Sequence, residues 1–486
     1  MTQTVAQRFA RNSALLSSAA VASFAFRFLR NIALAHLLSQ ADYGKCVLLS
    51  AVMASVQLLS DLGLDRMLIQ NRSTDNELLQ ATLTALSLAR AILSGLLLFA
   101  LAPLLSSALG MPDALPAFRY LSLTSMLQGL FHLDSKRLQR EHRFIPDIIV
   151  SVGGDAVEFS VAIAAAYIFR TYAILPAVFL CGALTGVLLS HWVAERRFAI
   201  GLNRQVAVQA LQFGYPLMLS GLIVLLASQA DRMVVGAAVG LQSVAIYGAA
   251  MTIISTPGIL IGRVGLSISM PFLTEAAENP ELFSRRFRSI GVMAVMAAVS
   301  IFVPLMLTGT KVIALVFGAR YAPPTDLVWI IAMGQTGTLL RVWPNVAALA
   351  LGDTRNLAIS NIPRLIGIVL AVVVTHFGAD LVEIAGCFAL AEVVALASAL
   401  GHLHWRRPGT LRGLALFLAL PCLFVALGVV AARLFAGDIL KECAASFVLV
   451  TAFLGTSVSL SEDARGIAER VWRQMQKMYS HGSSEG

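Results

Sequence analysis

Apolar residues dominate the chain in long runs, and only short polar segments separate them. Stretches of about 20 apolar residues are long enough to cross the hydrocarbon core of a bilayer as an α-helix. Fourteen such stretches follow one another, and little chain is left between them. They lie at residues 13–38, 43–61, 82–107, 114–131, 146–168, 173–193, 213–237, 242–270, 288–309, 325–350, 360–378, 380–403, 412–435 and 443–460. The pattern predicts an all-α integral membrane protein with fourteen transmembrane helices.

The composition supports this prediction. Hydrophobic residues make up 58% of the 486 residues and charged residues only 13%, whereas soluble proteins carry about 25% charged residues. The net charge of +9 does not point to nucleic acid, because the cations are distributed by side. With the N-terminus in the cytoplasm, twenty-two lysines and arginines fall in cytoplasmic segments and seven on the opposite side. This positive-inside pattern predicts a multi-pass protein with both termini in the cytoplasm.

Other features argue against secretion, a metal centre or catalysis. The first apolar stretch is too long for the core of a signal peptide and contains arginines, so we expect a retained helix. The five cysteines are scattered singly, which predicts neither a disulfide framework nor a metal site. No catalytic motif is present, and no loop outside the cytoplasm exceeds about fifteen residues. We therefore expect neither enzymatic activity nor a cofactor.

A short internal repeat predicts two halves. Tyr43-Gly44 and Tyr247-Gly248 each follow an apolar helix end and a polar turn, so the same unit opens both halves. Parallel repeats of this kind are related by an axis along the membrane normal, and they suggest a central cavity. The predicted domains are a six-helix half at 1–197, a cytoplasmic linker at 198–212, a second six-helix half at 213–404, an appended helix pair at 405–460 and a basic cytoplasmic tail at 461–486.

Ionisable residues at membrane depth are the functional candidates, since such residues usually face a water-filled cavity or each other. Seven are arginines and four are carboxylates. They are Arg27, Arg30, Arg90, Asp155, Glu158, Asp231, Arg232, Arg263, Arg341, Arg364 and Glu392.

Arg27 and Arg30 are the strongest candidates among them. They share one helix face, with Asn31 four residues after Arg27, and they lie about 20 Å along the first helix. At that depth they do not easily reach the interface, so a polar cavity wall is expected. Guanidinium groups suit bidentate binding of phosphate oxygens, which predicts an anionic ligand carrying phosphate. Arg263 and Arg341 would add to this cationic cavity from the other half.

Three carboxylates are candidates for ion coupling. Asp155 and Glu158 lie three residues apart on the predicted fifth helix, and neighbouring carboxylates in a low dielectric suit a proton or cation site. An ion pair with Arg90 is the structural alternative. Asp231 falls opposite Arg27 in the repeat alignment, and a structural ion pair between the halves is as consistent with its position as ligand contact.

The opening of the chain resembles a known family. "RNIALAHLLSQADYGKCVLLSAV" (30–52) and "SDLGLDRMLIQNRS" (60–73) are similar to the start of the polysaccharide transporter family, the O-antigen and exopolysaccharide flippases of the multidrug/oligosaccharidyl-lipid/polysaccharide exporter superfamily. The resemblance implies transport of an undecaprenyl-diphosphate-linked oligosaccharide from the cytoplasmic to the periplasmic leaflet of the bacterial inner membrane. It also implies alternating access, for the biosynthesis of lipopolysaccharide O-antigen or exopolysaccharide.

The resemblance extends to one residue of the site and to expected partners. Related lipid II flippases carry an Arg-Asp pair in the first helix, and Arg30-Asn31 occupies the matching place with Asn31 replacing the acid. Expected partners are the lipid-linked oligosaccharide, membrane lipids, and a polymerase and glycosyltransferases of the same pathway, but no nucleic acid. One alternative is a multidrug or cation antiporter of the same superfamily, which the excess of arginine disfavours. Another is a membrane polysaccharide polymerase or ligase, which the lack of a large outer loop disfavours.

Overall fold

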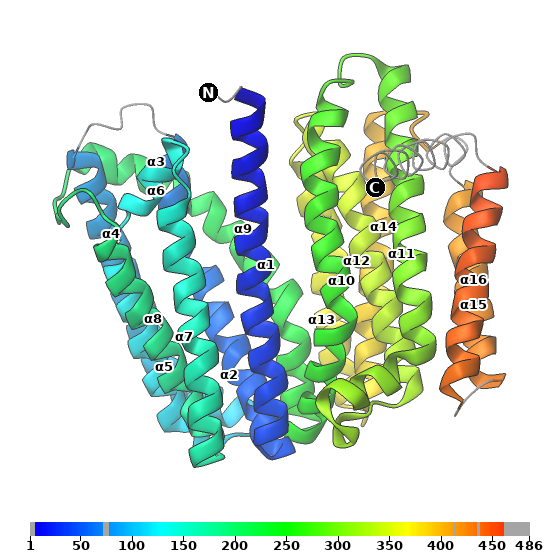
Figure 1. Cartoon of the computed structure of the whole chain (residues 1–486), viewed down its shortest axis with the longest axis horizontal. Helices are drawn as coiled ribbons and strands as arrows, with labels where there is room; N and C mark the ends of the chain where they lie inside the picture. Colours follow the sequence, from blue (N-terminus) through cyan, green and yellow to red (C-terminus); the bar gives the residue numbers. More distant parts are fainter. Residues whose placement is uncertain (1–4, 71–76, 412–414, 435–437, 461–486) are drawn as a thin grey trace, which may run out of the picture. The chain divides into compact units, whose positions relative to one another are not determined.

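The computed structural model describes residues 5–70, 77–411, 415–434 and 438–460 (Figure 1). Within these residues every regular element is a helix, and each of the fourteen predicted stretches coincides with a long helix or with the short 3₁₀ turn beside it. Ten helices in the described ranges are long and apolar enough to cross a membrane. The chain is therefore a multi-pass membrane protein, and the number of fourteen spans stays a prediction. The predicted tail at 461–486 lies outside the described residues.

The chain forms two compact units, Met1–Gly248 and Ala249–Gly486. The domain boundaries expected from the repeat stay a prediction. The long helices of the N-terminal unit are α1 (Val5–Leu37), α2 (Gln40–Leu59), α4 (Glu77–Ala108), α5 (Leu115–Leu127), α7 (Ile145–Phe169), α8 (Leu175–Trp192) and α9 (Arg204–Ala238). Helix α10 (Leu241–Thr274) begins in this unit and continues into the next.

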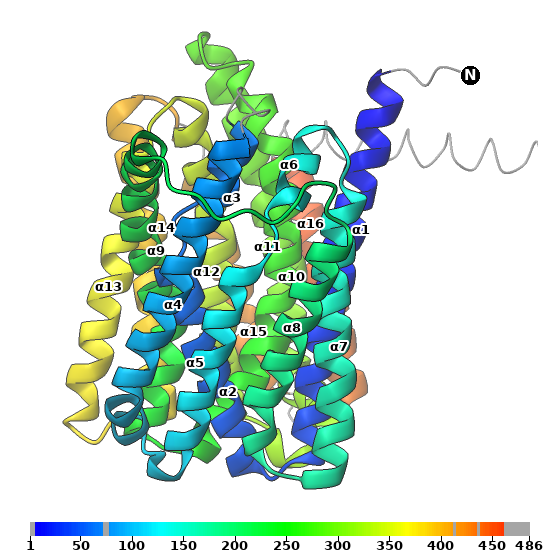
Figure 2. The same cartoon turned by 90° about the vertical axis from the view of Figure 1, so that its left-hand side faces the viewer.

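In the N-terminal unit, α1 packs against α7, and α7 packs against α8 (Figures 1 and 2). Helix α5 packs against both α4 and α8, and α2 packs against α9. Two short helices, α3 (Leu64–Gln70) and α6 (Asp134–Arg140), contact each other. The hydropathy pattern did not predict these two, because a seven-residue helix is too short to produce a membrane-spanning signal.

A buried carboxylate fixes the chain after α8 against α6. Asp134 is fully buried and accepts hydrogen bonds from Arg137 Nε at 2.5 Å and from the backbone N–H groups of Glu195 at 2.8 Å and Arg196 at 3.2 Å. Burial by itself raises the pKa of Asp134, but these hydrogen bonds outweigh burial and lower it. The carboxylate therefore stays ionised and holds this end of the unit together.

The C-terminal unit contains the rest of α10, then α11 (Pro280–Phe317), α12 (Thr325–Ala350), α13 (Arg355–Thr375), α14 (Leu381–Arg406), α15 (Ala415–Leu434) and α16 (Ile439–Leu460). Helix α14 packs against α12 and α13, while α15 and α16 contact each other and α11. Trp343 stacks on Phe287 at 4.4 Å between ring centroids and donates its indole N–H to the Phe287 carbonyl at 2.8 Å. A Cβ at Gly291 would lie 2.2 Å from the Trp343 ring, so only glycine fits there.

Candidate substrate-binding site in the N-terminal unit

A cavity of about 530 Å³ lies within the N-terminal unit. It is lined by residues of α1, α2, α3, α4, α6, α7 and α8 and of the segment between α5 and α6. Four cationic and four anionic side chains line it, so their formal charges cancel. These side chains are Arg27, Arg30, Arg90, Lys136, Asp65, Asp147, Asp155 and Glu158.

Two ion pairs join α1 to α7 in the wall of this cavity. Arg27 forms a bidentate pair with Asp155, at 2.9 Å from Nε to Oδ1 and 3.1 Å from Nη2 to Oδ2. Arg30 Nη1 donates to Glu158 Oε2. The partners are 128 residues apart in both pairs. The equal separation means that the two pairs follow each other in the same order along both helices, so α1 and α7 run in the same direction. The two residues predicted to bind phosphate and two of those predicted to couple ions therefore form one cluster.

The two arginines differ in their surroundings. The Arg30 side chain is only 9% exposed and lies 5.1 Å from the centre of the Phe179 ring on α8. Its Nε is buried and has no hydrogen-bond partner among the described residues. The Arg27 side chain is 61% exposed. Arg30 is thus a desolvated cation with an unused donor, whereas Arg27 is largely exposed while it remains paired with Asp155.

Helix α8 makes room for the buried pair. A Cβ at Gly182 would lie 2.2 Å from Cγ and 2.7 Å from Oε1 of Glu158. A Cβ at Gly186, one turn later, would lie 2.7 Å from the Phe131 ring. Both glycines and Phe179 line the cavity. We did not predict their role, although the spacing of Gly182 and Gly186 is the GxxxG spacing of close helix packing.

Polar residues extend the cavity toward the end of the helices that the cation pattern assigns to the cytoplasm. Lys136 and Asp147 form an ion pair at 2.6 Å. Arg90 donates to the Ser60 carbonyl at 3.0 Å and forms no ion pair with a described residue. The Asp65 side chain lines the cavity, and protein encloses the cavity around it. This enclosure raises the pKa of the Asp65 carboxyl, although the nearby charges of Lys136 and Arg90 oppose the shift.

The other predicted site residues of this unit lie outside the cavity. Asn31 is half-buried and does not line it. Asp231 accepts a hydrogen bond from the Tyr247 hydroxyl at 3.0 Å and one from the backbone N–H of Arg232 at 2.8 Å. The alternative of a structural ion pair between Arg90 and the α7 carboxylates is not what the structure contains, since Arg27 and Arg30 occupy those carboxylates.

The predicted residues of the C-terminal unit fall in two places. Arg263 is exposed on α10. Arg341 Nε lies 3.2 Å from Glu392 Oε2, and Arg364 Nε lies 2.5 Å from Glu392 Oε1. This buried triad connects α12, α13 and α14. Arg364 is therefore paired with Glu392 inside this unit.

The family comparison identifies the chain. A family model described as polysaccharide biosynthesis protein matches residues 33–325. The chain belongs to this family. It is 24% identical over 340 residues to the succinoglycan biosynthesis transport protein ExoT of Rhizobium meliloti (strain 1021), covering 69% of this chain and 68% of ExoT. The resemblance seen in the first helices is therefore confirmed.

Solved structures of one transporter superfamily share this fold. The lipid II flippase MurJ in an inward closed conformation aligns with a TM-score of 0.68 and 11% identity, over 92% of this chain and 99% of MurJ. An inward-facing multidrug resistance MATE transporter of the MOP superfamily aligns with a TM-score of 0.65 and 17% identity, over 81% and 96% of the two chains. A MOP superfamily transporter from Pyrococcus furiosus aligns with a TM-score of 0.56 and 16% identity, over 83% and 96%.

The buried pair predicts a non-additive effect of mutation. Removing one partner of a buried ion pair costs about 3–5 kcal/mol, because the other charge is left without compensation, whereas replacing both by apolar residues is often neutral. Glu158→Leu should therefore lower the melting temperature of the purified protein in detergent, and Arg30→Leu/Glu158→Leu should melt closer to wild type than Glu158→Leu does.

The exposed pair of Arg66 and Asp61, 3.5 Å apart with side chains 60% and 47% exposed, provides the control. Arg66→Leu should change the melting temperature little, since exposed pairs contribute little. Equal melting temperatures for Glu158→Leu and the double variant would contradict a coupled pair.

Proposed function

We propose that this protein moves an undecaprenyl-diphosphate-linked oligosaccharide from the cytoplasmic to the periplasmic leaflet of the bacterial inner membrane, for the biosynthesis of O-antigen or exopolysaccharide. Transport proceeds by alternating access, and both termini lie in the cytoplasm. The diphosphate binds in the cavity of the N-terminal unit, at Arg30 and Arg27. Arg263 and Arg341 are secondary candidates, because one is exposed and the other is paired with Glu392.

One observation carries the proposal: two arginines at membrane depth line a cavity, where carboxylates hold them in place. A phosphate presents oxygen acceptors to a guanidinium much as a carboxylate does. The diphosphate can therefore take the place of Asp155 and Glu158 on the same arginines. Because the charges of the cavity cancel, an anion gains net attraction only when these carboxylates move away or take up protons.

Family and relatives support the same substrate class. The family is named for polysaccharide biosynthesis, and ExoT is named as a transport protein of succinoglycan biosynthesis. A fold shared with a lipid II flippase is compatible with a cargo that carries a lipid diphosphate. No described residues form a cluster suited to hold a metal ion.

A multidrug or cation antiporter is the second candidate. The fold is also that of multidrug resistance MATE transporters, and a formally neutral cavity does not repel a cation. Family membership and the buried Arg30 with its free donor favour the anionic cargo. A polymerase or ligase remains the third candidate, and the position of accumulated intermediates distinguishes it.

The first test is polysaccharide export. In a deletion strain complemented with Arg27→Ala/Arg30→Ala, polymer should be absent, and single lipid-linked units should accumulate on the cytoplasmic face, because the phosphate ligands are lost. Surface polymer and accessible lipid-linked sugar are measured at matched protein levels. Arg232→Ala is the control, since Arg232 is an intramembrane arginine that donates to Gln229 and does not line the cavity. Normal polymer from the double variant contradicts the proposal, and accumulation on the outer face points to a polymerase.

The second test concerns ion coupling by Asp155 and Glu158. If protonation releases these carboxylates from the arginines, an imposed pH gradient should accelerate translocation of a lipid-linked oligosaccharide in proteoliposomes. Asp155→Asn and Glu158→Gln should each weaken this response at least severalfold, because the amides do not titrate. Asp231→Asn, outside the cavity and bonded to Tyr247, is the comparison. If the response is lost only in Asp231→Asn, the coupling site is Asp231 and not the α1–α7 cluster.

A further inference from the structure

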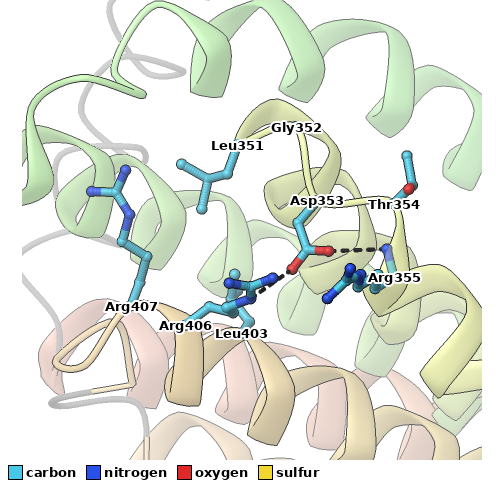
Figure 3. A pocket seen from close by; sticks show the side chains of 8 residues that line it. All are labelled: Leu351, Gly352, Asp353, Thr354, Arg355, Leu403, Arg406 and Arg407. Carbon is cyan, nitrogen blue, oxygen red and sulfur yellow. Dashed lines mark hydrogen bonds and ion pairs between the residues drawn. The ribbon is translucent and has the colours of Figure 1, made fainter.

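A second cavity, of about 430 Å³, lies within the C-terminal unit, where α12 ends, α13 begins and α14 ends (Figure 3). The turn at 351–354 forms one side and the last residues of α14 with Arg407 the other. Three arginines line it, Arg355, Arg406 and Arg407, with one carboxylate, Asp353. Figure 3 shows Arg407 on one side of the opening and Arg355 on the other. Nothing in the proposed transport mechanism uses this cavity.

The single carboxylate already has several donors. Asp353 Oδ1 accepts the backbone N–H of Arg355 at 2.9 Å. Its Oδ2 lies 3.1 Å from His402 Nε2 and 3.5 Å from Arg406 Nε. Burial by itself raises the pKa of Asp353, but the hydrogen bonds from Arg355 N–H and His402 outweigh burial and lower it. Asp353 is therefore ionised, and it offsets only one of the three arginines.

The remaining two arginines have spare donors. Arg407 Nη2 donates to the Ala277 carbonyl at 3.1 Å, which leaves its other guanidinium N–H groups. The Arg355 side chain is exposed and makes no hydrogen bond or ion pair with the described part of the chain. The cavity thus has an excess of two positive charges and offers planar donors from opposite sides, an arrangement that suits a phosphate group.

The surroundings place this cavity at the boundary of the membrane. Helices α13 and α14 are both long and apolar enough to cross it, and their ends meet here. Trp405 is 73% exposed, with the Arg406 guanidinium 5.6 Å from its ring; exposed tryptophans typically lie at the level of the headgroups. Farther along α13, about two and three turns after Arg355, Ile362 and Ile366 are 54% and 62% exposed. They provide an apolar surface for an acyl chain.

We propose that this cavity binds the phosphate of an anionic phospholipid, with its headgroup between Arg355 and Arg407 and an acyl chain along α13. The positive-inside pattern assigns this end of the helices to the cytoplasm, and basic pockets between transmembrane helices on that side bind anionic headgroups. Free phosphate would meet the same arginines but would gain nothing from the apolar face of α13. Bound lipid connects the turn before α13 to the end of α14, and through Arg407 to the turn before α11, so it stabilises the unit.

The test compares lipids on the purified full-length protein in detergent. Added phosphatidylglycerol should raise the melting temperature and bind in native mass spectrometry, while phosphatidylcholine and inorganic phosphate at equal concentration should do neither. Arg355→Gln/Arg407→Gln should bind phosphatidylglycerol about thirtyfold more weakly, since each arginine near an anionic headgroup contributes about 1 kcal/mol and about 1.4 kcal/mol corresponds to a tenfold change. Arg285→Gln, an exposed arginine of α11 outside the cavity, should bind like wild type.

A second variant keeps the test decisive if the double variant does not fold. Arg355→Gln alone removes no hydrogen bond or ion pair within the described residues, so it should fold and still weaken binding severalfold. Unchanged binding in Arg355→Gln, equal weakening in Arg285→Gln, or equal stabilisation by inorganic phosphate would each overturn the assignment to a phospholipid. None of these outcomes bears on sugar transport.

Discussion

The ion pairs between α1 and α7 are the constraint on which the rest of the N-terminal unit depends. In the predicted topology α1 crosses the membrane, where an isolated arginine costs several kcal/mol. Matching acceptors beside Arg27 and Arg30 offset that cost. Asp155 and Glu158 provide these acceptors at the same three-residue spacing on a parallel helix. The pairs therefore fix the register of α1 and α7, and the Glu158 side chain in turn requires glycine at position 182 of α8.

The same pairs define what the cavity can do. A cavity with unpaired arginines would bind an anion tightly and also bear the full desolvation penalty when empty. Here the protein's own carboxylates replace the anion, so the empty cavity is neutral and stable. In the proposed function a phosphate would exchange with these carboxylates, and uptake of protons would favour that exchange. In this account the phosphate site and the coupling site are one cluster with two alternative sets of partners.

The C-terminal unit handles its membrane charges differently. Glu392 lies between Arg341 and Arg364, so one carboxylate serves two arginines on different helices. The triad holds α12, α13 and α14 together and retains one net positive charge. All three side chains are largely buried. We therefore regard the triad first as a packing device of that unit.

Sequence alone predicted the long helices, because apolar runs of membrane length leave little choice of structure. It also identified all four residues of the α1–α7 cluster, since charge is rare at that depth. It did not pair them: the spacing within each helix was visible, but which helices are neighbours depends on tertiary packing. The short helices α3 and α6 were missed because they are too short to change the hydropathy pattern. The role of Gly182 was missed because it depends on the packing of α8 against Glu158.

The most direct test of the central claim is the affinity of the purified protein for a short prenyl diphosphate, such as farnesyl diphosphate, in wild type and in Glu158→Gln. If Glu158 competes with the substrate phosphate for Arg30, the variant should bind farnesyl diphosphate severalfold more tightly than wild type, and neither protein should bind farnesol comparably. Weaker or unchanged binding of farnesyl diphosphate by Glu158→Gln would contradict the account, because the carboxylate would then support the site without exchanging with a ligand.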